Sequence, residues 1–378
     1  MDTVDSKINK SKFHYPVRVL MISLDRGLFG GGYSGDVLER HKIYANEVGG
    51  LDIIVFADAS FGNKVWPPNL RVFPTRSGKW SHYRKAVSLA AKLNQENKYD
   101  LLVTQDFAAP AGARIKNSLR IPWIVSVHSM FFSRAWLNLN PINWYLFYLI
   151  RKAVRGADGF RVNNEAMRDK FLAWGIRNPI LIQPTPIDIE KFKAKSEKRK
   201  AGTPKILFVG RLAPEKNISM LIQAVKNIKA DFELQIVGGG PEERKLKSLT
   251  GNDPRIKFTG PKTLDELPMI FGSADIFVLP SNSESYGQVL LQAAASGCAI
   301  IATATAGAKN ILGDSEYGKI IPVNSQTDLE QALEELITIQ YQREYWQGRT
   351  RELASRYDSK IGVARTINFW KEIANKRS

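Results

Sequence analysis

Two positively charged side chains follow one of the apolar runs of this 378-residue chain. In the stretch FVGRLAPEKNI, Arg211 and Lys216 lie between the run KILFVG and an amphipathic segment that begins near Asn217. We expect Asn217 to cap that helix. Charged side chains beside free helix N–H groups attract anions, because their charges add to the helix dipole. The alternative is a pair of solvated surface charges, but the loop's place after an apolar run favours a phosphate or diphosphate site.

A carboxylate opens the stretch SESYGQVLLQAAASG, which follows the apolar run DIFVLP. Glu284 precedes a helix that we expect to start near Tyr286 or Gly287, and Gln292 lies inside it. A carboxylate in such a loop accepts hydrogen bonds from sugar hydroxyls, or stabilises positive charge that develops on a sugar ring. The alternatives are a surface acid near a helix N-terminus for Glu284 and ordinary helix surface for Gln292, whose amide can donate and accept.

The first half of the chain holds two more candidates. His128 ends the run PWIVSVH and is one of only four histidines; the alternative is a half-buried imidazole with satisfied hydrogen bonds. Gly30, Gly31 and Gly32 follow the first apolar run without the G-x-G-x-x-G spacing of dinucleotide sites, so they suit a phosphate, a sugar or a simple turn. The glycines of ELQIVGGG, residues 238–240, are equally consistent with a plain turn.

Short apolar runs alternate with amphipathic segments along the whole chain, and this order predicts parallel sheets flanked by helices. The fold class is therefore α/β, with two doubly wound, Rossmann-like domains that face each other across a cleft. Ligands bind beyond the carboxyl ends of the strands in such sheets, where the candidate residues lie. The expected strands are residues 17–24, 51–57, 100–106, 122–128, 159–164, 205–210, 233–240, 256–260, 275–280 and 299–304.

The domain boundaries follow from length and composition. A chain of 378 residues is too long for one ordinary core, and a charged stretch at residues 192–205 indicates a linker. We expect a first domain over residues 1–190, a linker over 191–204 and a second domain over 205–355. Residues 356–378 form a separate amphipathic segment, with Trp370 on the apolar side.

The charge of the chain is concentrated in its first half. Residues 1–200 hold 32 Lys and Arg against 17 Asp and Glu, whereas residues 201–378 hold 22 against 20. A basic half attracts phosphorylated substrates or anionic lipid, although solubility alone also explains it. We do not expect nucleic acid, because no nucleic-acid motif accompanies the charge. The single cysteine, Cys298, fits a reducing compartment, and no apolar stretch reaches the length of a spanning helix.

Two aromatic and basic segments are candidates for contact with an anionic membrane. Residues 76–93 are the preferred one, since basic and aromatic side chains on an amphipathic helix suit the interface. Residues 141–158 are a second aromatic-rich run that ends in basic residues, and we favour a buried helix for it. The side chains that make the first segment a candidate are Arg76, Lys79, Trp80, Tyr83, Arg84 and Lys85.

Taken together, these stretches resemble glycosyltransferase family 4, whose members are retaining enzymes of the GT-B fold. The resemblance extends from about Val17 and is strongest over residues 205–325. Because a C-terminal helix commonly crosses back onto the first domain in this fold, the resemblance implies the same for residues 356–378. FVGRLAPEKNI is similar to the family's diphosphate-binding Arg/Lys loop, and SESYGQVLLQAAASG to its Glu-x7-Glu segment. IQPTPIDIEKF resembles the domain-joining segment Asn-Gly-Val-Asp-x-x-x-Phe: Asp188 and Phe192 match, while Thr185 and Pro186 replace Asn-Gly.

The resemblance implies a role for each candidate residue. Arg211 and Lys216 would neutralise the diphosphate of a nucleotide-sugar donor, and Glu284 would hold the transferred sugar. His128 would lie at the reacting centre, and residue 292 would hold the ribose. The donor site would comprise Gly31, Gly32, Arg211, Lys216, Glu284, Ser285, Tyr286, Gly287 and Gln292. The family commonly works without a metal or other cofactor, and no Asp-x-Asp metal motif is present. Gln292 departs from the family, which has glutamate there.

The resemblance predicts a hexosyltransferase (EC 2.4) that moves a sugar from a nucleotide-diphosphate sugar to a saccharide or lipid-linked acceptor, in cell-surface glycan or glycolipid synthesis. We expect it in the cytoplasm, peripheral on the inner face of the membrane. Two alternatives remain: a catalytically weak or inactive GT-B protein that binds sugar nucleotide, and a nucleotide-sugar 2-epimerase, which would need more acids and histidines in the cleft.

Overall fold

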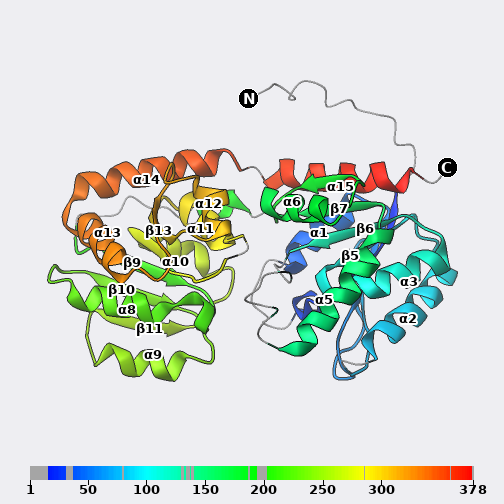
Figure 1. Ribbon diagram of the computed structural model, residues 1–378, viewed down its shortest axis with the longest axis horizontal. Coiled ribbons are helices and arrows are strands. Elements are labelled where there is room, and N and C mark those ends of the chain that lie inside the picture. The colour runs from blue at the N-terminus through cyan, green and yellow to red at the C-terminus, as the bar shows by residue number, and fades with distance from the viewer. Residues whose placement is uncertain are drawn as a thin grey trace.

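The computed structural model describes residues 16–30, 37–78, 81–128, 132, 137, 140–185, 188–193, 202–284, 286–357 and 359–376. These residues form two lobes, each built around one sheet (Figure 1). Apolar runs shorter than eight residues, separated by amphipathic segments, become buried strands between helices. The two-domain α/β prediction is therefore confirmed.

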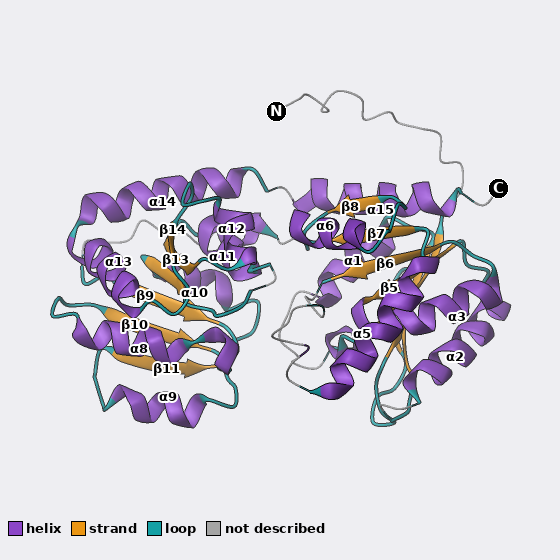
Figure 2. Cartoon of the chain, in the orientation of Figure 1, coloured by secondary structure: helices purple, strands orange, loops and turns teal. Residues whose placement is uncertain are grey.

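The first sheet has eight strands in the order β3-β4-β2-β1-β5-β6-β7-β8 (Figure 2). Its neighbouring strands run parallel, except that β3 is antiparallel to β4. The strands are β1 (Arg18–Ser23), β2 (Gly50–Val55), β3 (Lys64–Trp66), β4 (Leu70–Pro74), β5 (Leu101–Gln105), β6 (Trp123–Val127), β7 (Gly159–Val162) and β8 (Ile180–Ile182).

Helices cover both faces of this sheet. On one face, α2, α3, α5 and α6 contribute buried residues to the same core as Leu20, Trp123 and Phe160. On the other face, α1 and α15 pack in a second core that includes Met21 and Ile124. The helices that the described residues form in this lobe before α15 are α1 (Val37–Asn46), α2 (His82–Glu96), α3 (Ala109–Leu119), α5 (Pro141–Ala153) and α6 (Glu165–Ala173), with short 3-10 turns η1 (Arg26–Phe29), η2 (Asp106–Ala108) and η3 (Val154–Gly156).

The second sheet has six parallel strands in the order β11-β10-β9-β12-β13-β14. They are β9 (Lys205–Val209), β10 (Glu233–Val237), β11 (Ile256–Gly260), β12 (Ile276–Leu279), β13 (Ala299–Thr303) and β14 (Lys319–Ile321). The accompanying helices are α7 (Ile189–Lys193), η4 (Pro214–Lys216), α8 (Ile218–Asn227), α9 (Glu243–Thr250), α10 (Leu267–Ser273), α11 (Gln288–Ala295), α12 (Ala306–Leu312), α13 (Gln326–Thr338) and α14 (Gln340–Ser355).

Two segments connect the lobes. Helix α7 contains the boundary that we placed after residue 190, yet Ile189 and Phe192 are buried in the second core, where Phe192 contacts Phe271 at 5.7 Å between ring centroids. The chain returns through α15 (Ser359–Ala374), which lies along the first lobe in Figure 1. There Trp370 is 3% exposed and packs against Tyr44 of α1, with 5.4 Å between the two ring centroids.

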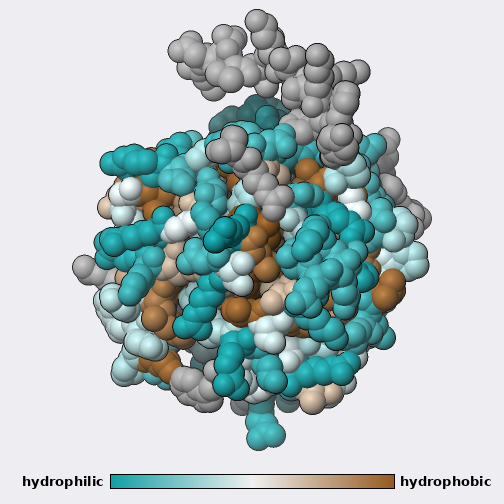
Figure 3. Space-filling model, turned by 90° about the vertical axis from the view of Figure 1, so that its right-hand side faces the viewer, coloured by the Kyte–Doolittle hydropathy of each residue, from teal (hydrophilic) through white to brown (hydrophobic). Residues whose placement is uncertain are grey.

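The surface of the first lobe is mixed. Figure 3 views the molecule from the end of this lobe and shows hydrophilic side chains over most of the face, with smaller hydrophobic patches between them. Within the described residues, no helix combines the length and apolarity that crossing a bilayer requires.

Candidate active site

Lys216 and Glu284 meet in the second lobe, from loops that follow two neighbouring strands. Because β9 and β12 are paired and parallel, their carboxyl ends lie side by side. Lys216 Nζ donates to Glu284 Oε2 at 2.5 Å, and the two side chains are only 19% and 15% exposed. The backbone N–H of Asn282 also donates to the carbonyl of Glu215 at 2.8 Å, which joins the two loops. The structure thus brings a cation and the predicted sugar-binding acid into one pair.

Arg211 begins the first of these loops and is exposed. Its side chain forms no hydrogen bond or ion pair with the described residues, so the guanidinium can meet a ligand. The loop backbone is fixed by the glycines after β10: Leu212 N–H donates to Gly239 O at 3.0 Å. Gly238 has φ +138, and a Cβ there would lie 1.9 Å from Gly210 O. Packing against the arginine-bearing loop therefore explains the glycines after β10, and no contact between these glycines and a ligand is needed to explain them.

Asn217 does not cap α8 as we expected. It occupies the position before the helix, but its φ of 48 and ψ of 41 are left-handed, and its side chain makes no capping hydrogen bond. A cap needs extended backbone to aim its oxygen at the first N–H groups. The Asn217 amide instead donates to Asn282 Oδ1 at 3.1 Å and to Asn324 Oδ1 at 3.0 Å, which ties three loops together.

The segment after Glu284 leads into α11. The backbone carbonyl of Glu284 accepts a hydrogen bond from Gly307 N–H at 2.9 Å, so the start of α12 holds this loop in place. Tyr286 is 6% exposed, and its hydroxyl has no hydrogen-bond partner in the described part of the chain. Gly287 precedes the helix with φ 77, a left-handed conformation that glycine adopts at low cost. The helix therefore starts one residue later than the later of our two predictions, at Gln288.

Gln292 is 6% exposed and is therefore not an ordinary surface residue. It lines a cleft of about 1410 Å³, together with Gln288 one turn earlier. The amide of Gln292 has no hydrogen-bond partner among the described residues. This position leaves it able to bind a polar ligand group in the cleft.

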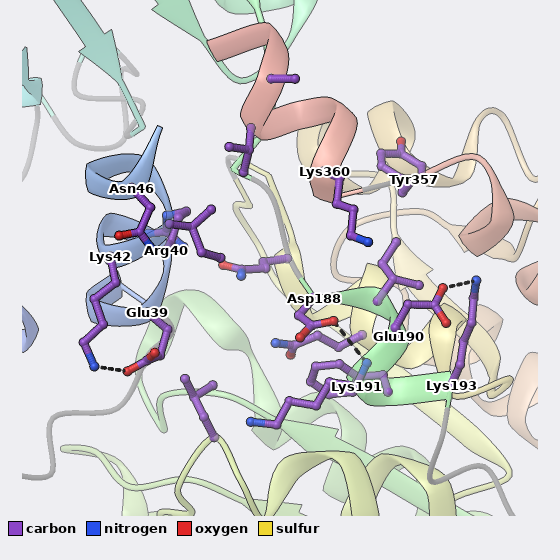
Figure 4. A pocket seen from close by; sticks show the side chains of 18 of the residues that line it. Glu39, Arg40, Lys42, Asn46, Asp188, Glu190, Lys191, Lys193, Tyr357 and Lys360 are labelled. Carbon is purple, nitrogen blue, oxygen red and sulfur yellow. Dashed lines mark hydrogen bonds and ion pairs between the residues drawn. The ribbon is translucent and has the colours of Figure 1, made fainter. Parts of the chain in front are cut away.

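The cleft lies between the lobes, and charged side chains dominate its wall. Figure 4 shows α1 on one side with Lys42 paired to Glu39 at 2.8 Å, and α7 on the other with Lys193 paired to Glu190 at 2.8 Å. Lys360 of α15 reaches in between. The lining also includes Arg40, Ile43, Asn46, Glu47, Pro67, Asp188, Ile189, Lys191, Phe192, Leu264, Gln288, Gln292, Ser355, Tyr357, Val363 and Ala364.

His128 follows β6 at the carboxyl end of the first sheet and is half-buried. Its backbone N–H donates to Asp106 Oδ1 at 2.8 Å, and Asn163 Nδ2 donates to its carbonyl at 3.2 Å. The imidazole lies 3.0 Å from Ser126 Oγ through Nε2 and 3.4 Å from Thr185 Oγ1 through Nδ1. It has no hydrogen bond to Lys216 or Glu284, so the histidine and the ion pair are separate parts of the described structure.

The charge state of His128 is set by its surroundings. Desolvation lowers its pKa well below 6.5, and the positive charges of Arg161 and Arg40 lower it further. The imidazole is therefore neutral at pH 7. Arg161 Nη1 donates to Ser126 Oγ at 3.4 Å, which leaves the serine hydroxyl hydrogen able to point to His128 Nε2.

Arg161 is the residue that sequence reasoning missed. It lies on β7 and is only 5% exposed, although arginine is rarely buried without a partner. The signal was a charge inside the run GFRVNN, whose neighbours Phe160 and Val162 are fully buried. A charged residue in a strand covered on both faces indicates a structural or binding role that hydropathy alone does not reveal.

Three of the predicted donor-site residues, Gly31, Gly32 and Ser285, lie outside the described residues, as do Lys79 and Trp80 of the first membrane segment. The described part of the chain holds no group of three His, Cys, Asp or Glu side chains placed to bind a metal ion. Metal-independent activity stays a prediction.

The predicted membrane helices differ from expectation. The α2 helix exposes Arg84 and Lys85, but Tyr83 turns inward and donates to Phe107 O at 3.0 Å. The buried helix that we favoured for residues 141–158 is wrong: in α5 only Ile150 is buried, because α5 lies at the outer layer of the lobe. Its exposed side chains include Ile142, Trp144, Tyr145, Tyr148, Arg151 and Lys152.

Two family models match the chain. Residues 49–191 match the model described as Glycosyltransferase Family 4, and residues 188–353 match the model described as Glycosyl transferases group 1. Among curated relatives, sulfoquinovosyl transferase SQD2 of Arabidopsis thaliana is 25% identical over 368 residues, which cover 87% of this chain and 70% of that protein. Alpha-monoglucosyldiacylglycerol synthase of Streptococcus pneumoniae is 25% identical over 278 residues, or 67% of this chain and 62% of that protein.

Solved structures share the fold. Sucrose-phosphate synthase from Thermosynechococcus elongatus superposes with a TM-score of 0.82 at 17% identity, over 94% of this chain and 99% of that chain. Anabaena Alr3699/HepE in complex with UDP and glucose has a TM-score of 0.74 at 17% identity, over 94% of this chain and 100% of that chain. Because both structures are only 17% identical to this chain, the superpositions establish the shared fold alone.

Proposed function

Because the chain belongs to the family 4 glycosyltransferases of GT-B fold, we propose that it is a retaining hexosyltransferase that uses a nucleotide-diphosphate sugar. The observation that carries the proposal is the ion pair between Lys216 and Glu284 beside the unpaired Arg211. In the donor, the diphosphate is bonded directly to the sugar. On the protein, the cations lie next to the acid, so the cations can bind the diphosphate while the acid binds the sugar.

Binding of the donor would exchange the partners of this pair. In the free protein Lys216 neutralises Glu284, which limits the cost of holding a carboxylate that is 15% exposed. When the diphosphate arrives, Lys216 and Arg211 turn to its oxygens, and Glu284 accepts hydrogen bonds from the sugar hydroxyls. Arginine and lysine then stabilise the negative charge that grows on the leaving diphosphate.

The transfer step itself needs no group beyond the substrates and these side chains. An acceptor hydroxyl attacks the anomeric carbon on the face that the diphosphate leaves. The bond from the acceptor oxygen to that carbon forms, the bond from the carbon to the phosphate oxygen breaks, and the hydroxyl proton passes to that phosphate oxygen. Neutral His128 does not compete as an acid and offers a hydrogen bond at the far side of the sugar.

The acceptor is proposed to be a saccharide or a lipid-linked molecule at an anionic membrane. Relatives include a phosphatidyl-myo-inositol mannosyltransferase of Mycobacterium leprae and the diacylglycerol enzyme above. We assign the membrane contact chiefly to α5, since its aromatic side chains face outward while its C-terminal end carries Arg151 and Lys152. The exposed Arg84 and Lys85 of α2, which covers the same sheet face, add positive charge.

A donor screen tests this function. Thermal-shift measurements with UDP-, GDP- and ADP-sugars identify the nucleotide, and NMR of the product with the binding donor gives the anomeric configuration. We expect one nucleotide series to raise the melting temperature of the protein and its sugar to be transferred with retention. Inversion at the anomeric carbon, or epimerised nucleotide sugar as the product, contradicts the proposal.

One observation favours a second candidate, a protein that binds sugar nucleotide and turns it over poorly. Gln292 stands where the family has glutamate, so the ribose contact lacks a charge. A donor that binds in the screen without release of nucleotide diphosphate would favour this candidate.

A further inference from the structure

Arg161 is buried on β7 without a carboxylate partner among the described residues. Its Nε donates to Gln183 O at 3.0 Å and its Nη1 to Ser126 Oγ at 3.4 Å, whereas Nη2 has no partner. By contrast, the buried carboxylate of Asp52 in the same lobe is partnered, by Arg71 and Tyr99. A buried charge without a direct ion pair is costly, so Arg161 lowers the free energy of unfolding of the ligand-free protein.

Further unpartnered polar atoms surround it. The hydroxyls of Tyr44 on α1 and Tyr286 before α11 have no hydrogen-bond partner among the described residues, and these side chains are 2% and 6% exposed. Both lie within electrostatic reach of Arg161, as do the guanidinium of Arg40 and the carboxylate of Asp106. A guanidinium N–H and two phenols are hydrogen-bond donors, and oxygen atoms of an anion would satisfy all three.

Two unpartnered acceptors complete the cluster. Asn163 donates its Nδ2 to a carbonyl, which leaves Oδ1 as the unpartnered atom. His41 lies 2.6 Å from Val37 O through Nδ1, so that nitrogen carries the hydrogen and the unpartnered Nε2 is an acceptor. These atoms fit hydroxyl groups, so the cluster as a whole matches an anionic group on a hydroxylated ring.

The cluster adjoins the proposed transfer site from both lobes. Arg161 is linked to His128 through Ser126, and Tyr286 is two residues beyond Glu284. The orphan atoms are closed to solvent in this structure. Tyr286 belongs to the second lobe and the others to the first, so a separation of the lobes uncovers them.

We propose that Arg161, Tyr44 and Tyr286 bind an oxyanion, a carboxylate, sulfonate or phosphate, that is carried by one of the two sugars of the transfer reaction. This inference rests on the proposed function and adds to it that the enzyme handles an acidic sugar. Arg211 and Lys216 remain the ligands of the donor diphosphate, so the new site is a second anion site. The acidic sugar is either the one transferred or the acceptor.

The test compares acidic and neutral sugars in two arms by calorimetry. The donor arm uses UDP-glucuronate and UDP-glucose, or the same sugars on the nucleotide that binds, and the acceptor arm uses methyl glucuronide and glucose 6-phosphate against methyl glucoside with nucleotide diphosphate bound. We expect the acidic ligand to bind at least about tenfold tighter in one arm. Arg161→Met should abolish that preference, and Arg161→Lys should retain part of it. Nucleotide diphosphate alone should bind the unaltered protein and both variants equally.

Stability separates a binding role from a structural one. Arg161→Met should leave unchanged or raise the melting temperature of the free protein, because it removes an uncompensated buried charge. Arg71→Met is the matched control and should lower it, since Arg71 neutralises buried Asp52.

Equal binding of acidic and neutral sugars in both arms, or a preference that survives Arg161→Met, overturns the proposal. So does a loss of nucleotide diphosphate binding in that variant. The acceptor arm and the stability comparison need no turnover. A failure of glycosyl transfer with an intact acidic preference therefore counts against the proposed function and not against this site.

Discussion

At the scale of single residues, the site depends on charges that the fold either pairs or leaves unpaired. Lys216 and Glu284 neutralise each other, whereas the side chains of Arg211 and Gln292 have no partner among the residues that the structure describes. Their place after strands could be predicted, because parallel strands end at one edge of a sheet. The burial of Gln292 and the pairing of Lys216 with Glu284 could not, because both depend on how separate loops pack.

Replacement of Gln292 by glutamate tests the ribose contact. Charge-assisted hydrogen bonds are about twice as strong as neutral ones, so we expect Gln292→Glu to tighten nucleotide diphosphate binding by roughly 0.5–1.5 kcal/mol. The free variant should melt at a lower temperature, since a carboxylate at a position 6% exposed loses hydration. Calorimetry with Gln288→Glu as control should show no gain for the control. Unchanged or weaker binding by Gln292→Glu would exclude a ribose contact.

Buried His41 makes stability depend on pH. Burial, then Arg40, lower its pKa to about 3. Below pH 6.5 the unfolded chain binds a proton at this residue that the folded protein refuses, so the free energy of unfolding falls as pH decreases toward 3. His41→Gln should reduce the slope between pH 6 and 4 by about 1.4 kcal/mol per pH unit, which denaturant unfolding measures. An identical slope in the variant would show that His41 is protonated in the fold.

At the scale of elements, the buried central strands were predictable and most edge strands were not. All ten expected strands are present, and β11 (Ile256–Gly260) is the edge strand among them. The four that were missed, β3, β4, β8 and β14, lie at or next to sheet edges. Their residues are partly exposed, as in the alternating burial of β4 (Leu70–Pro74), so they lack continuous apolar runs. The outward face of α5 was missed because its aromatic residues suit a core equally well.

The face of α5 predicts where an anionic membrane binds. Trp144→Ser with Tyr145→Ser should reduce flotation of the protein with vesicles of anionic lipid by more than half, because these rings supply the apolar contact. Arg84→Ser with Lys85→Ser on α2 should cause a smaller loss that disappears at high salt. Neutral vesicles should bind neither form strongly. Retention of the α5 variant on anionic vesicles would remove α5 from the membrane surface.

At the scale of the whole molecule, the cleft combines a basic first half with a nearly neutral second half. The two-domain fold followed from the alternation of strands and helices and from the length of the chain. The placement of α7 in the second core depended on contacts of Phe192 that no local pattern specifies, whereas α15 packs on the first lobe, onto which we expected residues 356–378 to cross back. These two segments connect the lobes, so they are the elements that must bend if the cleft opens.

The central claim is that Glu284 and Lys216 form the donor-sugar site of a glycosyltransferase. The most direct measurement is kcat/KM for transfer by Glu284→Gln, which keeps the shape of the side chain and removes its charge. Glu335→Gln is the control, because Glu335 is an acid of α13 that pairs with Lys319 outside the loops of the site. We expect a loss of at least about 100-fold, roughly 2.7 kcal/mol of transition-state stabilisation, and less than a threefold change in the control. A Glu284→Gln enzyme that transfers sugar as fast as the unaltered protein would contradict the account.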